Sequence, residues 1–307
     1  MRPRRSVLAC PGSNPRMMER AAGSDADEVF LDLEDAVAPG EKAAARATIV
    51  TALRTHDFGR KIRCVRINQV DSPFALRDIL EVVEGAGDHL DALMVPKVQT
   101  AGDVAFVDRA LGSLEGQMGL ARPIGLEVQL EDGLGLTNIA EIAQASPRVE
   151  ALIFGPGDFA AALRLPQLTV GEMPEGYPGD LWHYALFRIV VTARAFGLAA
   201  VDGPFAAIRD LDGLRRSASR SAALGFDGKW ALHPTQIGPL NEVYSPTPAQ
   251  FARAREILEA YRRATQEDRR GAVMLGDEMI DEASRKMAAQ LYERGRLVGM
   301  EDSAPRD

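Results

Sequence analysis

The chain alternates short apolar stretches with longer polar ones, and each apolar stretch stops at a polar or turn residue. Eight stretches have the length and composition of buried strands: residues 6–10, 28–33, 62–67, 92–95, 124–130, 151–154, 199–201 and 229–232. Consecutive stretches are separated by enough residues for a helix. This pattern predicts an α/β fold, a (β/α)8 TIM barrel, in which polar residues that follow the strands lie on the functional face.

Apolar residues at helical spacing predict helices at residues 40–53, 180–196 and 211–224. Residues 165–179 are rich in proline and glycine, which predicts a loop over the mouth of the barrel. Beyond Tyr244 we expect a charged helix at residues 249–264, a linker at 267–271 and a last helix from Asp281 to about residue 296. The chain is therefore expected to form a catalytic barrel, residues 1–245, and a C-terminal helical extension, residues 246–307, that packs on a neighbouring subunit.

Charge and cysteine content narrow the class of protein. The 307 residues include 36 basic and 44 acidic side chains, and the net charge of −8 gives no electrostatic reason to expect nucleic acid as a partner. The two cysteines suit a reducing compartment. The apolar stretch behind the basic first residues is too short for a secretion signal, and no run approaches the roughly 20 residues of a membrane-spanning helix. We expect a cytoplasmic protein with no membrane partner that acts on a small molecule.

Two carboxylates follow neighbouring strands of the predicted barrel. Glu131 comes directly after the fifth apolar stretch, and Asp158 follows the sixth after a Gly-Pro-Gly turn. A pair of carboxylates, with the remaining positions left to water and substrate oxygens, is what Mg²⁺ prefers. The alternative is that each residue only caps a helix, one entered at Asp132 and the other at Phe159. Because the two carboxylates lie on adjacent strand ends, we predict a metal site there.

Arg66 lies inside an apolar stretch, where a guanidinium is costly unless it binds an anion. A substrate carboxylate or an enolate oxygen near the metal would supply one. The alternative is a buried ion pair with Asp32 or Glu34 of the second strand, and both interpretations can hold together. Asp32 and Glu34 share one face of a regular strand, and Asp35 begins the turn. We expect this acidic group to hold Arg66 or the water ligands of the metal.

A set of motifs extends over nearly the whole chain. They are Arg5-Ser6 through Pro11-Gly12-Ser13-Asn14-Pro15, Leu31-Asp32-Leu33-Glu34-Asp35-Ala36-Val37 with Lys42 following, Val65-Arg66-Ile67-Asn68, Val95-Pro96-Lys97, Glu131, Gly155-Pro156-Gly157-Asp158, Val201-Asp202-Gly203-Pro204-Phe205 and Gly228-Lys229-Trp230-Ala231-Leu232-His233-Pro234. Together they resemble the citrate lyase β-subunit-like branch of the HpcH/HpaI aldolase superfamily. The last two bring the chain nearer to malyl-CoA, β-methylmalyl-CoA or citramalyl-CoA lyases than to the carrier-protein-dependent citrate lyase subunit.

The resemblance implies a Mg²⁺-dependent barrel, a homotrimer or homohexamer, that cleaves a 3-hydroxyacyl-CoA into an acyl-CoA and an α-keto acid such as glyoxylate or pyruvate. It assigns Glu131 and Asp158 as metal ligands, with Mn²⁺ as a substitute ion. It assigns Arg66 as the catalytic arginine and Asp281 as the acid/base aspartate of the extension. The residues that it places near substrate or CoA are Arg20, Lys97, Leu232 and His233.

Other interpretations of the same residues remain. The site could hydrolyse malyl-CoA to malate and free CoA, cleave a citryl thioester or act on free acids, or the barrel could be a non-catalytic CoA-binding subunit. Asp281 could simply cap the helix that starts at Glu282. Ala9 and Asn14 stand where related lyases carry an aromatic and a basic residue that help to hold CoA, which leaves the CoA contacts of the first loop open.

Overall fold

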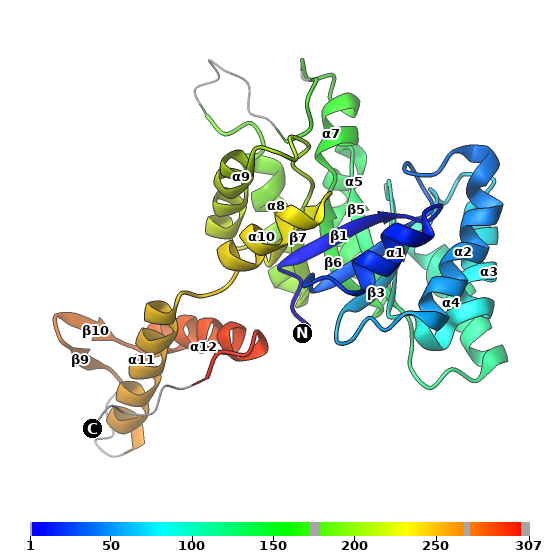
Figure 1. Cartoon of the computed structure of the whole chain (residues 1–307). Helices are drawn as coiled ribbons and strands as arrows, with labels where there is room; N and C mark the ends of the chain where they lie inside the picture. Colours follow the sequence, from blue (N-terminus) through cyan, green and yellow to red (C-terminus); the bar gives the residue numbers. More distant parts are fainter. Residues whose placement is uncertain (1, 167, 172–178, 267–270, 302–307) are drawn as a thin grey trace. The chain divides into compact units, whose positions relative to one another are not determined.

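The structure, a computed structural model, describes residues 2–166, 168–171, 179–266 and 271–301. Its larger compact unit, Arg4–Tyr244, is built on eight parallel strands that close into a barrel in the order of the sequence (Figure 1). They are β1 (Ser6–Pro11), β2 (Glu28–Asp32), β3 (Ile62–Arg66), β4 (Ala92–Val95), β5 (Gly125–Leu130), β6 (Val149–Phe154), β7 (Ala199–Asp202) and β8 (Gly228–Ala231). The predicted barrel is confirmed, with strand ends shifted by at most one or two residues.

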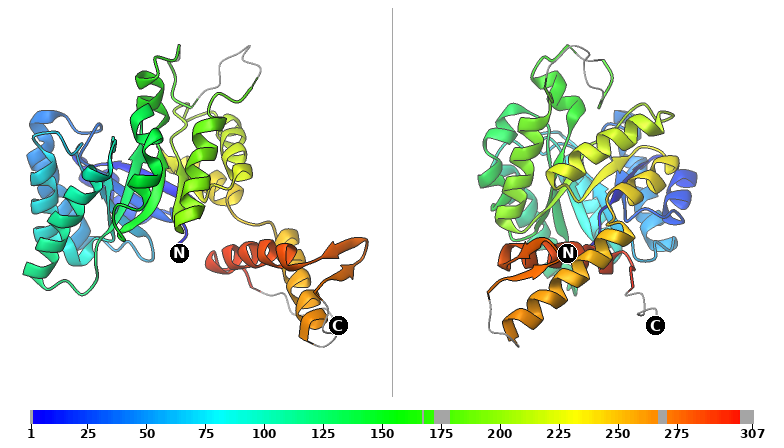
Figure 2. Two further views of the ribbon diagram at one scale, coloured as in Figure 1. Left: turned by 180° about the vertical axis from the view of Figure 1, so that it is seen from behind. Right: turned by 90° about the vertical axis from the view of Figure 1, so that its left-hand side faces the viewer.

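Helices follow the strands and lie outside the barrel in each view (Figures 1 and 2). They are α1 (Pro15–Ala22), α2 (Lys42–Thr55), α3 (Ala75–Ala86), α4 (Ala101–Met118), α5 (Gly133–Thr137), α6 (Ile139–Ala143), α7 (Pro156–Ala162), α8 (His183–Phe196), α9 (Leu211–Leu224) and α10 (Ile237–Val243), with 3-10 turns η1 (Pro39–Glu41), η2 (Gly87–His89) and η3 (Pro234–Gln236). The three helices predicted from periodicity correspond to α2, α8 and α9. The predicted loop at 165–179 lies partly outside the described residues.

Side-chain alternation along the strands separates two apolar cores. One core fills the layer between the strands and the helices. The other lies inside the barrel and contains Val7, Phe30, Cys64, Ala92, Met94, Ile153, Val201 and Trp230. Because this interior core blocks the middle of the barrel, polar chemistry is confined to its two ends.

The amino-terminal end of the barrel is closed by a buried ionic cluster. Arg4 Nε donates to Glu127 Oε1 at 2.8 Å and to Glu28 Oε2 at 3.2 Å, while its Nη2 donates to Glu150 Oε2 at 2.6 Å. One ligand atom each from Glu28, Cys64 and Glu127 lie within 4.8 Å of one another, although Arg4 already bridges the two glutamates. Burial raises the pKa of the Cys64 thiol well above its usual value. We assign this cluster to stability, as is usual at this end of such barrels.

The smaller unit comprises Ser245–Asp307 with Met1–Pro3. It contains α11 (Pro248–Gln266), an antiparallel hairpin of β9 (Val273–Leu275) and β10 (Glu278–Ile280), and α12 (Glu282–Leu297). Phe251 and Tyr292 stack at 4.8 Å between ring centroids. Both helices were predicted, but the hairpin was not. Most of the predicted linker, residues 267–270, lies outside the described residues. No helix in the described part of the chain is long and apolar enough to cross a membrane.

Candidate active site at the mouth of the barrel

Glu131 and Asp158 meet at the carboxyl ends of the neighbouring strands β5 and β6. Glu131 directly follows β5 and is only 3% exposed, whereas the Asp158 side chain, in the first turn of α7, is 46% exposed. Burial, reinforced by the adjacent Asp158 and Glu34, raises the pKa of Glu131 well above its usual value. The capping alternatives are wrong for both residues, because Asp132 caps α5 and Gly155 is the N-cap of α7.

The start of α7, which carries Asp158, packs closely against Gly203, the residue that follows β7. A Cβ at Gly203 would clash with the carbonyl oxygen of Phe154 and with the ring of Pro156, so only glycine fits there. Asp202 accepts a hydrogen bond from the Gly203 N–H at 2.8 Å, and its other oxygen pairs with the buried Lys229 Nζ at 2.6 Å. Burial lowers the pKa of Lys229. The Asp202–Lys229 pair lies on the side of β7 and β8 that faces the helices, and it fixes the strand end next to α7.

Lys97 links the metal-site candidates to the acidic loop after β2. Its φ of 52° is rare for a residue with a side chain, and this conformation directs its N–H to Glu131 Oε1 at 3.0 Å. Its ammonium contacts Glu34 Oε1 at 2.5 Å, Asp35 Oδ1 at 3.5 Å and Asp158 Oδ1 at 4.0 Å. Burial alone would lower the pKa of Lys97, but Glu34 outweighs burial and raises it. Lys97 is therefore a permanent cation among the acids.

Arg66 is buried at the end of β3 and is held by two carboxylates. It forms a bidentate pair with Asp32, with both N–O distances 2.7 Å, and its Nη1 lies 2.9 Å from Glu34 Oε2. Burial would lower the pKa of Arg66, but the Asp32 carboxylate dominates and raises it. The guanidinium carbon also lies over the rings of Phe30 and Trp230, at 5.5 and 5.3 Å from their centroids. The predicted ion pair is thus present with both Asp32 and Glu34.

The mouth of the barrel carries more negative than positive side chains. The acidic members of the cluster are Asp32, Glu34, Asp35, Glu131 and Asp158, and the basic members are Arg66 and Lys97. Burial raises the pKa of Glu34 despite its two cationic partners. Oxygen ligands in excess over cations suit a hard divalent cation such as Mg²⁺. Glu131 and Asp158 are the pair best placed to bind it, because Asp32 and Glu34 are already engaged by Arg66.

The remaining predicted site residues make the following contacts. Arg20 is exposed in the last turn of α1, and the exposed His233 is the N-cap of η3. The Leu232 N–H donates to Gln236 Oε1 at 2.7 Å. Asp281 belongs to the smaller unit, where it caps α12 by accepting from the Ser284 N–H at 3.0 Å. Asn14 caps α1 in the same way through the Met17 N–H. The capping role of Asp281 is thus present, and its catalytic role stays a prediction.

Three residues near the cluster were missed in the sequence. Phe30 and Trp230, 4.5 Å apart between centroids, form the apolar floor beneath Arg66. Gln129 is buried two residues before Glu131. The signal for Gln129 was present, since Glu127, Gln129 and Glu131 alternate with leucine and valine along one strand. No comparable signal marked the aromatic pair, because Phe30 and Trp230 are far apart in the sequence.

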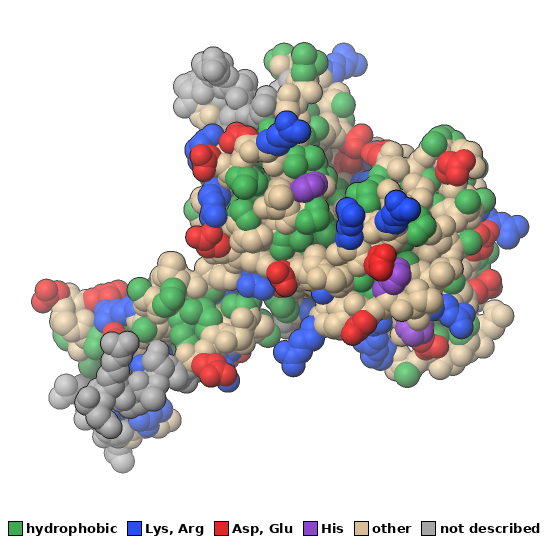
Figure 3. Space-filling model, viewed as in Figure 1, with side chains coloured by type: hydrophobic (Ala, Val, Ile, Leu, Met, Phe, Trp, Pro, Cys, Tyr) green, Lys and Arg blue, Asp and Glu red, His purple; other side chains and the backbone are tan. Residues whose placement is uncertain are grey.

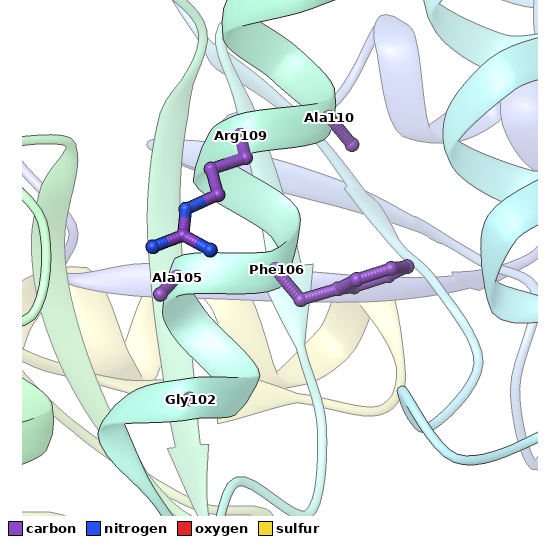
Figure 4. A pocket seen from close by; sticks show the side chains of 5 residues that line it. All are labelled: Gly102, Ala105, Phe106, Arg109 and Ala110. Carbon is purple, nitrogen blue, oxygen red and sulfur yellow. The ribbon is translucent and has the colours of Figure 1, made fainter.

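A hollow elsewhere, on the surface of α4, has no acidic residue in its lining. Gly102, Ala105, Phe106, Arg109 and Ala110 line it, all on α4, and Figure 4 shows Phe106 and Arg109 projecting from that one helix. It lacks a carboxylate and does not lie at a strand end. On the face drawn in Figure 3, acidic and basic side chains are scattered among each other, without a continuous basic surface of the kind that nucleic acid binding uses. The acidic mouth is therefore the candidate site.

The fold and this cluster define a (β/α)8 barrel protein with an acidic site at the carboxyl ends of its strands. Residues 5–234 match the family described as HpcH/HpaI aldolase/citrate lyase, and the chain belongs to it. It is 42% identical to the L-malyl-CoA/beta-methylmalyl-CoA lyase of Cereibacter sphaeroides (strain ATCC 17025 / ATH 2.4.3) over 97% of this chain and 96% of that protein.

Two further similarities bear on the function. A (3S)-malyl-CoA thioesterase of the same Cereibacter sphaeroides strain is 37% identical over 89% of this chain and 88% of that protein. The crystal structure of CitE from Mycobacterium tuberculosis, in complex with magnesium, acetoacetate and coenzyme A, superposes with a TM-score of 0.75. The two sequences are 28% identical, and the superposition covers 96% of this chain and 98% of the CitE chain.

Proposed function

We propose that this protein is a Mg²⁺-dependent carbon–carbon lyase that cleaves a 3-hydroxyacyl-CoA of the malyl-CoA type into an acyl-CoA and an α-keto acid. The reaction is reversible by a Claisen-type condensation. The observation that carries the proposal is the convergence of Glu131 and Asp158 beside the buried Arg66 at the mouth of the barrel. Similarity to malyl-CoA/β-methylmalyl-CoA lyases over nearly the whole chain supports the substrate class.

The donor set fits Mg²⁺. Glu131 and Asp158 offer carboxylate oxygens that lie close enough to interact with each other, so one cation could bind both. When bound, Mg²⁺ would act as a Lewis acid on the oxygens of the keto-acid half of the substrate and hold them in place. Mn²⁺ takes similar oxygen ligands and is expected to substitute.

Arg66 supplies fixed positive charge where the reaction needs it. Cleavage of the carbon–carbon bond leaves electrons on the thioester as an enolate, and a buried cation stabilises such charge more strongly than one in water. The guanidinium of Arg66 donates two hydrogen bonds to Asp32, which fix its orientation. Arg66 therefore needs little reorientation during the reaction. Lys97 holds Glu34 beside Arg66, which keeps the second carboxylate partner in place.

Two roles rest on the family resemblance. Asp281 exchanges a proton with the acyl-CoA carbon, acting from the extension of a neighbouring subunit in a homotrimer or homohexamer. Arg20, Leu232 and His233 contact CoA or substrate. Ala9, in β1, and Asn14, the N-cap of α1, leave the CoA contacts of this part of the chain open. The two unpaired buried cysteines support a cytoplasmic location, because they suit a reducing compartment.

A thioesterase activity is the second candidate, favoured by the similarity to the (3S)-malyl-CoA thioesterase. In that case the same site would activate water against the thioester and release malate and free CoA. The two activities differ in their products. A lyase forms a keto acid without free thiol, whereas a thioesterase forms free thiol without a keto acid.

A product screen tests the proposal. Purified protein is incubated with malyl-CoA, β-methylmalyl-CoA or citramalyl-CoA and Mg²⁺, and the keto acid and the free thiol are quantified in parallel. We expect glyoxylate or pyruvate to form in step with acyl-CoA, and EDTA to abolish it. Release of thiol without keto acid would replace the lyase by the thioesterase, and no turnover of any of the three substrates would reject both.

A further inference from the structure

Gln129 lies inside the barrel, directly below the carboxylate proposed to bind the metal. Leu126, Val128 and Leu130 of β5 belong to the core under the helices. The alternate residues of the strand, Gln129 and Glu131, therefore point to the interior. Two residues along a strand span roughly 7 Å, so the side chains of Gln129 and Glu131 belong to successive layers of the barrel interior. Gln129 thus lies one layer below Glu131 on the same side of the strand.

The carboxamide of Gln129 is buried and lacks a protein partner for its oxygen. Gln129 is 2% exposed, and no described residue donates a hydrogen bond to its Oε1. Its strand neighbour in register is Ile153, and the interior core contributes further apolar side chains. A buried acceptor without a donor is destabilising, so an amide at this position indicates a ligand that supplies the donor.

The groups that could donate a hydrogen bond to Gln129 Oε1 are few. An ionised carboxylate only accepts hydrogen bonds. Mg²⁺ bound by two carboxylates usually keeps several water molecules, and a metal-bound water is a strong donor. Arg66 and Lys97 are committed to Asp32 and Glu34.

We propose that Gln129 is a positioning residue for the metal, and that its buried Oε1 accepts a hydrogen bond from a water bound to the ion. The inference rests on the proposed Mg²⁺ site of the lyase. It predicts that Gln129 raises the affinity of the protein for the ion although it is not a ligand, and that it does so at a cost to the stability of the metal-free protein.

The test is metal binding without substrate. Mn²⁺ is titrated into the full-length wild type and into Gln129→Met, which keeps the length and loses the acceptor, and free Mn²⁺ is followed by electron paramagnetic resonance. We expect the Kd of Gln129→Met to rise about tenfold or more. The Tm of the metal-free variant should be higher than that of the wild type, because a buried unsatisfied amide has been removed. Gln117→Met, the same change at an exposed position of α4, should leave both values unchanged.

Turnover separates a role through the ion from direct contact with substrate. If Gln129 acts through the ion, excess Mg²⁺ should restore the kcat of Gln129→Met to near the wild-type value. An unchanged Kd, a lower Tm in the metal-free state or a kcat that saturating Mg²⁺ fails to restore would each overturn the inference. Failure of the wild type to bind Mn²⁺ would instead reject the metal site of the proposed function.

Discussion

The side chain of Glu131 passes directly over Gly155, the residue that follows β6. A Cβ at position 155 would lie 2.5 Å from Glu131 Cγ, closer than real side chains approach. The Gly155 N–H donates to the Leu130 carbonyl at 3.0 Å, which fixes the two strand ends together. The lack of a side chain at Gly155 therefore determines where the Glu131 carboxylate can lie relative to Asp158.

This contact predicts the effect of one added methyl group. Gly155→Ala should displace the Glu131 carboxylate and lower kcat by about 10²-fold, since a shift of roughly 1 Å at a catalytic group has effects of that size. The apparent affinity for Mg²⁺, from the dependence of turnover on its concentration, should fall as well. Gly116→Ala on α4, where a Cβ meets nothing within 4 Å, is the matched control and should retain full activity. Wild-type kinetics in Gly155→Ala would refute the positional role.

Arg66→Lys tests whether the guanidinium stabilises the transition state. Lysine keeps the charge but loses the planar fork that Asp32 holds, so kcat should fall by at least about 10²-fold. Steady-state kinetics with malyl-CoA would measure it, and Arg63→Lys on the same strand serves as the control. A variant with unchanged kcat and a higher KM would show that only uniform binding was lost.

The ion pair between Asp32 and Arg66 should contribute to the free energy of unfolding as well as to the site. Burial would raise the pKa of Asp32, but the pairing with Arg66 lowers it below its usual value. Such a group adds stability above its unfolded pKa of about 3.9 and loses it as the pH falls through the folded pKa. Asp32→Asn should therefore lower the free energy of unfolding at pH 7 by about 3 kcal/mol, because Arg66 keeps only Glu34.

Denaturant unfolding at several pH values would check this prediction. The gap between Asp32→Asn and the wild type should narrow as the pH falls below about 4, because Asp32 then takes up a proton first in the unfolded protein and, at still lower pH, in the folded protein. Glu242→Gln, which breaks an exposed pair with Arg215, should cost less than about 1 kcal/mol. A gap that does not vary with pH would mean that the ion pair is not the source of the difference.

The proposed role of Asp281 in a neighbouring subunit predicts complementation. Asp281→Ala and Asp158→Asn should each be inactive alone. After subunit exchange, mixed oligomers should regain part of the wild-type turnover, since some sites combine an intact Asp158 from one chain with an intact Asp281 from another. Light scattering must first establish the oligomer, and labelled subunits must establish exchange. No recovery despite exchange would limit Asp281 to its own chain or to its role as the cap of α12.

The strands and the acidic mouth were predictable because a parallel barrel buries each strand on both sides and places its polar residues at the ends. The positions of Glu131 and Asp158 at neighbouring strand ends followed from that rule. The ion pair of Arg66 with Asp32 or Glu34 was an alternative drawn from the cost of burying a guanidinium, and both pairs are present. The hairpin of β9 and β10 was missed because its strands have three residues each and alternate poorly in polarity, leaving the turn at Gly276 as the main signal.

Features that depend on contacts between segments distant in the sequence could not be predicted either. The φ of 52° at Lys97 arises because its N–H must reach Glu131 on the next strand, and local sequence does not encode that distance. The packing of Phe30 and Trp230 beneath Arg66 likewise depends on closure of the barrel between β1 and β8. Such features become visible only when the strands are placed side by side.

The most direct test of the account is the turnover of malyl-CoA by Asp158→Asn. The substitution is nearly isosteric and removes one proposed metal ligand, so the variant should fold with a Tm close to that of the wild type. We expect its rate of glyoxylate formation in saturating Mg²⁺ to be lower than that of the wild type by several orders of magnitude, and EDTA to abolish the wild-type rate. Full activity of Asp158→Asn in the presence of EDTA would contradict the assignment of Glu131 and Asp158 as the metal site.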